Sequence, residues 1–301
     1  MLPRILATLS LVGPAVLLAT FPRAEQPGAP ATPVFLNHFF VTLDPASYAD
    51  IEKGDFLKQE FASHEKRTTV RTDRTYTGQY FYGTNTYFEF FEAGPASGQK
   101  LGDSAVAFGV DRAGGIRELR QRLDAAGIQA EETTMTRQLG QVQIPWFLSL
   151  NPVGFPRSAT VSTWVMEYHP RFLAEWHAEA APRGGGLTRQ QILERYKAVL
   201  ASRPAHPILD DVVGLTIAVD AATKARFARL CEVWGYGSRT DGDATILEGP
   251  NIVLRLVPDS PGKRGIIEAR FKTTRTPGDR EVRFGRSALA FGTDRAATWR
   301  F

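Results

Sequence analysis

Three side chains that can bind a metal ion lie inside apolar, strand-like segments of this sequence. His38 lies in the segment FLNHFFVTLD, Glu89 in TYFEFFEA and Glu167 in VSTWVMEYH. Alternation along a strand places a carboxylate among aromatic rings in the second segment, and puts Val165, Glu167 and His169 on one face in the third. A buried carboxylate without a partner is costly, and a bound cation or metal ion removes that cost. These residues are therefore candidate ligands of a metal ion.

Each of these residues also has an ordinary structural interpretation. Glu89 suits an edge strand in which it forms an ion pair with an arginine, and His38 suits a hydrogen-bonded position in the core. His169 precedes Pro170 and suits the turn between a strand and a helix, so Glu167 is the better candidate of that pair. The sequence leaves these alternatives open.

The elements that must position these residues are repeated along the chain. Three apolar segments each end in an acid and precede a helical pattern: 35–44, 104–111 and 212–220. Counting back six residues from the closing Asp gives His38, then Ala105, then Gly214, so only the first copy holds a side chain that can bind a metal. The strand–helix unit is repeated, but only one copy has a side chain that can bind a metal. This pattern indicates a duplicated fold with a single site.

Further strands are predicted after each helix. Helices are predicted at 45–61, 113–126 and 221–234. Strands are predicted at 66–72, 77–82, 86–91, 141–150, 160–168, 244–247 and 251–257, with a partial fourth unit at 265–273 and 287–291. The pattern predicts an α+β fold.

The length and the linker signals predict two halves. The 301 residues are too many for one small core. We place a first paired-module domain at 34–181, a linker and helix at 182–207, and a second, degenerate paired-module domain at 208–301. The flexible joint is 182–186, and Thr188 with Gln191 forms a capping box for the following helix.

The first 33 residues differ from the rest of the chain. A cationic start, an apolar stretch at 5–19 and a leader rich in Ala and Pro predict a signal peptide and an exported protein, periplasmic or secreted. The apolar stretch is shorter than the roughly 20 residues of a membrane span, so no stable span is expected after its removal. The net charge of +4 comes from scattered Lys and Arg, which gives no footprint for nucleic acid.

The chain resembles the vicinal oxygen chelate superfamily, which includes glyoxalase I, bleomycin-resistance proteins and extradiol dioxygenases. The resemblance rests on the succession of βαβββ modules, the His of LNHFFVTLD and the Glu of YFEFFEA, and it covers most of the chain from Val34 onward. The phrases NHFFVTLD, YTGQYFYGTNTYFEFFEAG and WVMEYHPRF resemble an uncharacterised, often exported bacterial branch. The resemblance implies that the modules form curled mixed sheets around a cleft, with a helical insertion between the two halves.

The resemblance also implies a set of ligands for a divalent ion such as Zn, Fe, Mn or Ni. His38 matches the ligand of the opening strand, and Glu89 and Glu167 match the ligands of the closing strands of the first two modules. We therefore expect these three side chains to converge. In the second half, Gly214 and Arg255 stand where a His and a Glu would be, so no second metal centre is expected there.

Three hypotheses of function follow. The first is a metal-dependent isomerase, lyase or dioxygenase that acts on a small oxygen-bearing organic molecule, with Glu89 or Glu167 as the catalytic base. The second is a metal-free protein that binds or sequesters a small molecule in the same aromatic cleft. The third is a structural protein of the cell envelope, which predicts no well-formed pocket. The sequence leaves the oligomeric state open.

Overall fold

The computed structural model describes residues 31–95, 97–155, 160–177, 188–278 and 280–301. Within these, Thr32–Phe301 forms one compact unit. Residues 1–30 of the predicted signal peptide and leader at 1–33, and the joint at 182–186, lie outside the described residues.

The first eight-stranded sheet consists of two βαβββ modules. Its strands are β1 (Phe35–Leu43), β2 (Ser63–Val70), β3 (Thr75–Tyr82), β4 (Tyr87–Glu92), β5 (Ser104–Gly109), β6 (Ala130–Leu139), β7 (Val142–Pro152) and β8 (Val161–Tyr168). Their order in the sheet is β2-β3-β4-β1-β5-β8-β7-β6. The opening strand of each module pairs in parallel with its closing strand, and β1 pairs with β5 in antiparallel fashion to join the modules.

The second eight-stranded sheet repeats this order. Its strands are β9 (Leu209–Val219), β10 (Gly237–Asp241), β11 (Ala244–Glu248), β12 (Val253–Pro258), β13 (Gly265–Thr273), β14 (Glu281–Phe284), β15 (Ser287–Phe291) and β16 (Ala296–Arg300). They are arranged β10-β11-β12-β9-β13-β16-β15-β14. The predicted α+β class with repeated modules is confirmed.

Two of the three acids that close the repeated strands begin a helix, whereas Asp111 pairs with Arg189. Asp44 accepts a hydrogen bond from the Ser47 backbone N–H and begins α1 (Pro45–Lys53), and Asp220 does the same for Thr223 at the start of α5 (Ala221–Val233). The prediction of one helix over 45–61 is wrong. Gly54 adopts an extended conformation and ends α1, and a separate π-helical turn, η1, follows at Leu57–Phe61.

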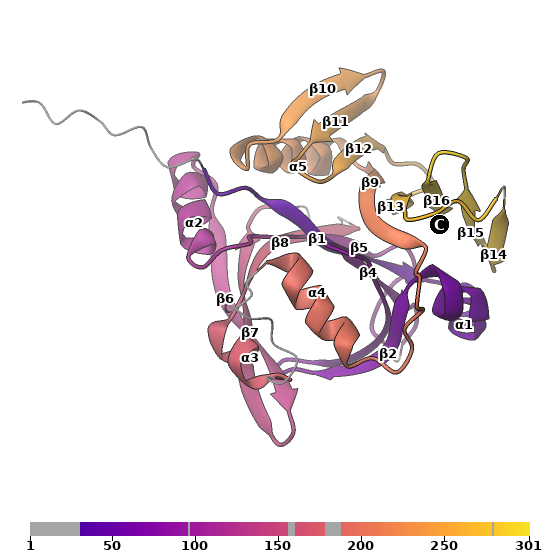
Figure 1. The fold of residues 1–301 in the computed structure, drawn as a ribbon. Helices are drawn as coiled ribbons and strands as arrows, with labels where there is room; N and C mark the ends of the chain where they lie inside the picture. Colours follow the sequence, from indigo (N-terminus) through magenta and orange to yellow (C-terminus); the bar gives the residue numbers. More distant parts are fainter. Residues whose placement is uncertain (1–30, 96, 156–159, 178–187, 279) are drawn as a thin grey trace, which may run out of the picture. The chain divides into compact units, whose positions relative to one another are not determined.

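Two cores hold the unit together. The larger core joins one face of each sheet through contacts between large aromatic rings, such as the pair Phe88 and Trp299 with centroids 5.9 Å apart. The smaller core lies on the opposite face of the first sheet, where α3 (Pro170–Glu175) and α4 (Arg189–Ala198) pack among aromatic side chains. Figure 1 shows α4 crossing the space enclosed by the curled strands of the first sheet.

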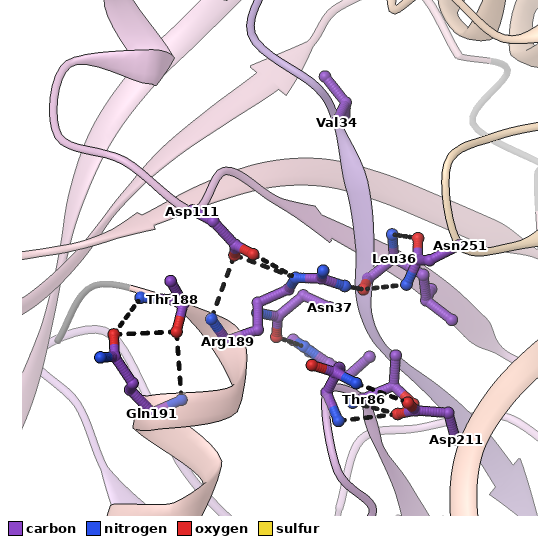
Figure 2. A network of polar contacts seen from close by, with 12 residues as sticks. Val34, Leu36, Asn37, Thr86, Asp111, Thr188, Arg189, Gln191, Asp211 and Asn251 are labelled. Atoms are coloured by element: carbon purple, nitrogen blue, oxygen red, sulfur yellow. Dashed lines mark hydrogen bonds and ion pairs between the residues drawn. The ribbon is translucent and has the colours of Figure 1, made fainter. Parts of the chain in front are cut away.

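Polar contacts lock α4 and the second half onto the first sheet. The Arg189 guanidinium donates to Asp111 Oδ1 at 3.0 Å and to the Leu36 carbonyl at 2.8 Å (Figure 2). Asn251, from the second half, donates to the same carbonyl and accepts from the Leu36 N–H. The helical insertion therefore fills part of the first sheet's concave face and is no mere spacer.

In the described part of the chain, no helix is both long and apolar enough to cross a membrane.

Candidate functional site

His38 and Glu89 lie side by side on the concave face of the first sheet. They project from the parallel neighbours β1 and β4, where His38 is paired with Tyr87 and Phe40 with Glu89. The His38 Nε2 and Glu89 Oε1 atoms are 3.6 Å apart, and both side chains are buried. The predicted approach of these two residues is confirmed.

The surroundings of His38 hold its ring in one orientation. Its Nδ1 lies 2.9 Å from the side-chain oxygen of Asn37, which can only accept a hydrogen bond, so Nδ1 carries the proton and Nε2 offers a lone pair toward Glu89. The ring stacks on Tyr87 at 4.4 Å and meets the edge of Trp164 at 5.6 Å. Burial, and then the nearby charge of Arg67, lower the pKa of His38 to about 3, so the imidazole is neutral at physiological pH.

Burial moves the pKa of Glu89 in the opposite direction. It raises the pKa of Glu89 to about 7, although the charge of Arg67 and a hydrogen bond from Tyr87 act to lower it. Arg67 is itself fixed by Glu65 at 2.5 Å and lies 3.9 Å from the centre of the Tyr80 ring. Glu89 is therefore populated in both its protonated and its ionised form near neutral pH, as a general acid–base group requires.

Glu167 lies on the other face of the sheet. Its two carboxylate oxygens accept hydrogen bonds from the backbone N–H groups of Gly114 and Ile116, at 2.8 and 3.0 Å, at the start of α2 (Gly115–Ala125). The predicted convergence of three ligands is wrong, and no group of three His, Cys, Asp or Glu able to hold a metal occurs within the described residues.

The strand register explains this error. When β5 is aligned with β1, Ala105 is equivalent to His38, and the β8 residue equivalent to Glu89 is Trp164. Glu167 is three residues farther along, and an odd offset turns a side chain to the opposite face.

A small cavity of about 60 Å³ adjoins His38 and Glu89. Aromatic rings line most of it, with Arg71 and Arg74 also contributing. The indole N–H groups of Trp146 and Trp164, which line it too, are buried and have no hydrogen-bond partner among the residues that the structure describes. Buried donors of this kind are normally satisfied, so they are suited to an oxygen atom of a ligand.

The family is established by comparison with known sequences. The model of a family of unknown function (DUF5829) matches residues 36–301. The chain belongs to this family. No curated protein matches the sequence.

Solved structures share the fold at low identity. A hypothetical protein from Staphylococcus aureus is 8% identical, with a TM-score of 0.50 over 83% of this chain and 95% of that chain. The Mn(II)-bound glyoxalase from Novosphingobium aromaticivorans is 10% identical, with a TM-score of 0.41 over 88% of this chain and 79% of that one. A halotolerant catechol dioxygenase is 10% identical, with a TM-score of 0.40 over 89% and 86%. The paired βαβββ modules agree with the architecture that the resemblance implied.

The side chains of the first half supply only part of a metal site. A catalytic metal ion is typically held by three protein ligands, whereas His38 and Glu89 are the two ionisable donors that the cleft brings together. The two remaining positions implied by the fold hold Ala105 and Trp164. This donor set does not fit the three-ligand centre expected from the sequence.

The second half lacks an equivalent site. Gly214 pairs with Val253 and Thr216 with Arg255, in the register of His38 and Glu89. A Cβ atom on Gly214 would meet the guanidinium of Arg270, at 2.5 Å from its Nε, and Arg255 forms an ion pair with Asp241.

Sequence reasoning missed the role of Arg67 and Trp164. Arg67 lies in a polar strand, HEKRTTV, that resembles an exposed one. Trp164 looked like an ordinary apolar strand residue. No local signal indicated that both face the cleft.

Proposed function

We propose that the cleft of the first half binds a small, oxygen-bearing organic molecule and that Glu89 transfers a proton to or from it. The observation that supports this most directly is the carboxyl of Glu89, with a pKa of about 7, beside a cavity that also contains unpartnered indole N–H groups. The same cavity argues against a purely structural protein of the envelope.

The side chains that line the cavity support ligand binding. The N–H groups of Trp146 and Trp164 donate to a carbonyl or carboxylate oxygen, which also satisfies two buried donors. Arg74 favours a negatively charged molecule, whereas Arg71 is paired with Asp73 at 2.8 Å. The rings of Tyr87 and the tryptophans exclude water, which strengthens each of these interactions.

Proton transfer then belongs to Glu89. In its ionised form it accepts a proton from a carbon atom next to the bound carbonyl, and in its protonated form it returns that proton to a neighbouring atom. The lone pair on His38 Nε2 lies 3.6 Å from Glu89 Oε1, so the neutral ring favours the protonated form of the carboxyl over the ionised form. The reaction class is an isomerase or a lyase.

The test is exchange of ligand hydrogen with solvent deuterium. Small carboxylic and keto acids that raise the melting temperature of the wild type are incubated with it in D₂O and followed by NMR. We expect exchange in the wild type, and a loss of about 10²-fold or more in Glu89→Gln. Glu92→Gln is the matched control because Glu92 is exposed at the end of the same strand. Equal rates in both variants would exclude Glu89 as the acid–base group.

A divalent ion at His38 and Glu89 is a second candidate function. It is favoured by the His38 tautomer, in which Asn37 holds Nδ1–H and leaves Nε2 free to bind a metal 3.6 Å from Glu89 Oε1. Elemental analysis for Zn, Fe, Mn and Ni tests this, with His38→Ala and Glu89→Ala expected to lower the metal content and Arg255→Ala expected to leave it unchanged. Sub-stoichiometric metal in the wild type would favour the metal-free protein.

Export is also a proposal. It is supported by the cationic and apolar start of the chain and by the small residues Ala29 and Ala31. Cell fractionation and N-terminal sequencing of the mature protein test it, and a cytoplasmic protein that retains residues 1–33 would contradict it.

A further inference from the structure

The inner cavity at His38 and Glu89 continues into a wider one. The outer cavity has a volume of about 610 Å³ and shares Phe40, Arg74 and Gln99 with the inner one. The inner cavity of about 60 Å³ has room for about two water molecules, and so for one functional group. A molecule larger than this that reacts at Glu89 extends beyond the inner cavity, and the outer cavity is one neighbouring space that can receive it.

Cationic side chains from three distant segments line the outer cavity. Arg74 precedes β3, Lys100 lies between β4 and β5, and Arg264 comes from the second half, between β12 and β13. Arg264 forms an ion pair with Asp259 at 3.2 Å, and Asp103 also lines the cavity. Within the described ranges, no ion pair is formed by Arg74 or Lys100. The lining therefore carries an excess of positive charge.

Neutral donors accompany these cations. The hydroxyl-bearing residues Thr75 and Ser162 also line the outer cavity. A group of cations and hydroxyls around one space is suited to the several acceptor oxygens of a phosphate or carboxylate group.

We propose that the outer cavity binds a phosphate or carboxylate group at one end of a ligand whose other end reacts at Glu89. This inference rests on the proposed function and narrows the ligand to an organic acid with a charged group remote from the reacting carbon. It also gives the second half a part in recognition, because Arg264 belongs to it.

The test compares ligands that differ in one charged group. Binding of 3-phosphoglycerate, glycerate and inorganic phosphate is measured by calorimetry and by ³¹P NMR line width. We expect 3-phosphoglycerate to bind about 10-fold or more tightly than glycerate. The double variant Lys100→Gln/Arg264→Gln should lose at least that factor, with a weaker salt dependence. Lys224→Gln/Arg283→Gln is the control, since it removes two positive charges that do not line this cavity.

The outcomes separate the two proposals. Equal affinity for 3-phosphoglycerate and glycerate, or affinity unchanged in the Lys100→Gln/Arg264→Gln variant, overturns the anion site. Phosphate binding that depends on Lys100 and Arg264 and persists in Glu89→Gln supports it, even where the wild type exchanges no ligand hydrogen with D₂O and the acid–base proposal fails.

Discussion

The two halves of this protein share a strand order and a strand register but differ in the chemistry of equivalent positions. His38 and Glu89 form a buried pair in the first half, whereas Gly214 and Arg255 occupy the same register in the second. The side chain of Arg255 is 40% exposed and pairs with Asp241. The comparison teaches that the backbone arrangement alone does not make a site.

Aromatic packing on the concave face of the first sheet accompanies this difference. The α3 and α4 region packs on the concave face of the first sheet, where Tyr196 stacks on Tyr82 at 5.7 Å and contacts Trp176 at 4.2 Å. Desolvation is the largest cause of the pKa shifts of both His38 and Glu89. Exposed ion pairs, such as that between Arg255 and Asp241, contribute little to the free energy of unfolding.

The largest expected effect comes from removing an aromatic side chain of α4. Tyr196→Ala should destabilise the fold by about 3 kcal/mol or more, because it leaves a cavity among packed aromatic rings. Urea unfolding measures this. Arg255→Ala, in the second half, should change stability by less than about 1 kcal/mol. Similar losses in both variants would contradict the role given to the insertion.

The next largest effect is the pH dependence of stability that Glu89 gives to the first half. The pKa of Glu89 is raised from 4.5 to about 7, so the folded state binds its proton more tightly than the unfolded state, and stability falls as pH rises from about 4.5 to about 7. Glu89→Gln lacks this loss and should gain, relative to the wild type, about 3 kcal/mol across that range.

His38 contributes with the opposite sign, because its pKa is lowered to about 3 and stability rises with pH from about 3 to about 6.5. Because both the wild type and Glu89→Gln contain His38, the contribution of His38 largely cancels in the difference between their stabilities. Unfolding in urea at pH 4.5, 6 and 8 gives the measurement, with Glu92→Gln as the control. A difference that does not change with pH would show that Glu89 titrates normally.

A smaller effect is expected for Glu167→Gln. The change removes a negative charge from the start of α2 and weakens hydrogen bonds to Gly114 and Ile116, so we expect a loss of about 1 kcal/mol. Ligand binding and metal content should not change, because the side chain faces away from the cleft. If the folded Glu167→Gln variant lost ligand binding or metal content, Glu167 would belong to the site.

The smallest effect is expected for Gly214→Ala. The added Cβ would meet the end of the Arg270 side chain, which is flexible and can move aside. We expect a change in melting temperature that corresponds to less than about 1 kcal/mol. A large loss would mean that the second half is packed as tightly as the first at this position.

Much of the fold could be predicted from local patterns, except where strands are exposed. The helices that begin after Asp44 and Asp220 were predicted because an acid followed by a helical pattern is a local signal. The strands β6 and β10 were missed, since β10 is wholly exposed and β6 mostly so, and neither alternates apolar with polar residues. They are strands because they pair with β7 and β11. The short strands β14 and β16 were missed as well, although Trp299 in β16 is buried, and both pair with β15.

The sequence by itself determined the repeated modules and the neighbouring positions of His38 and Glu89, because the period of a strand and the order of a module depend on nearby residues. Only the tertiary structure decided which face Glu167 occupies, how Arg67 acts on the pair, and that α4 packs among the aromatic side chains of the first sheet. Each of these depends on strand register or on contacts between segments far apart in the chain, and no local pattern specifies either.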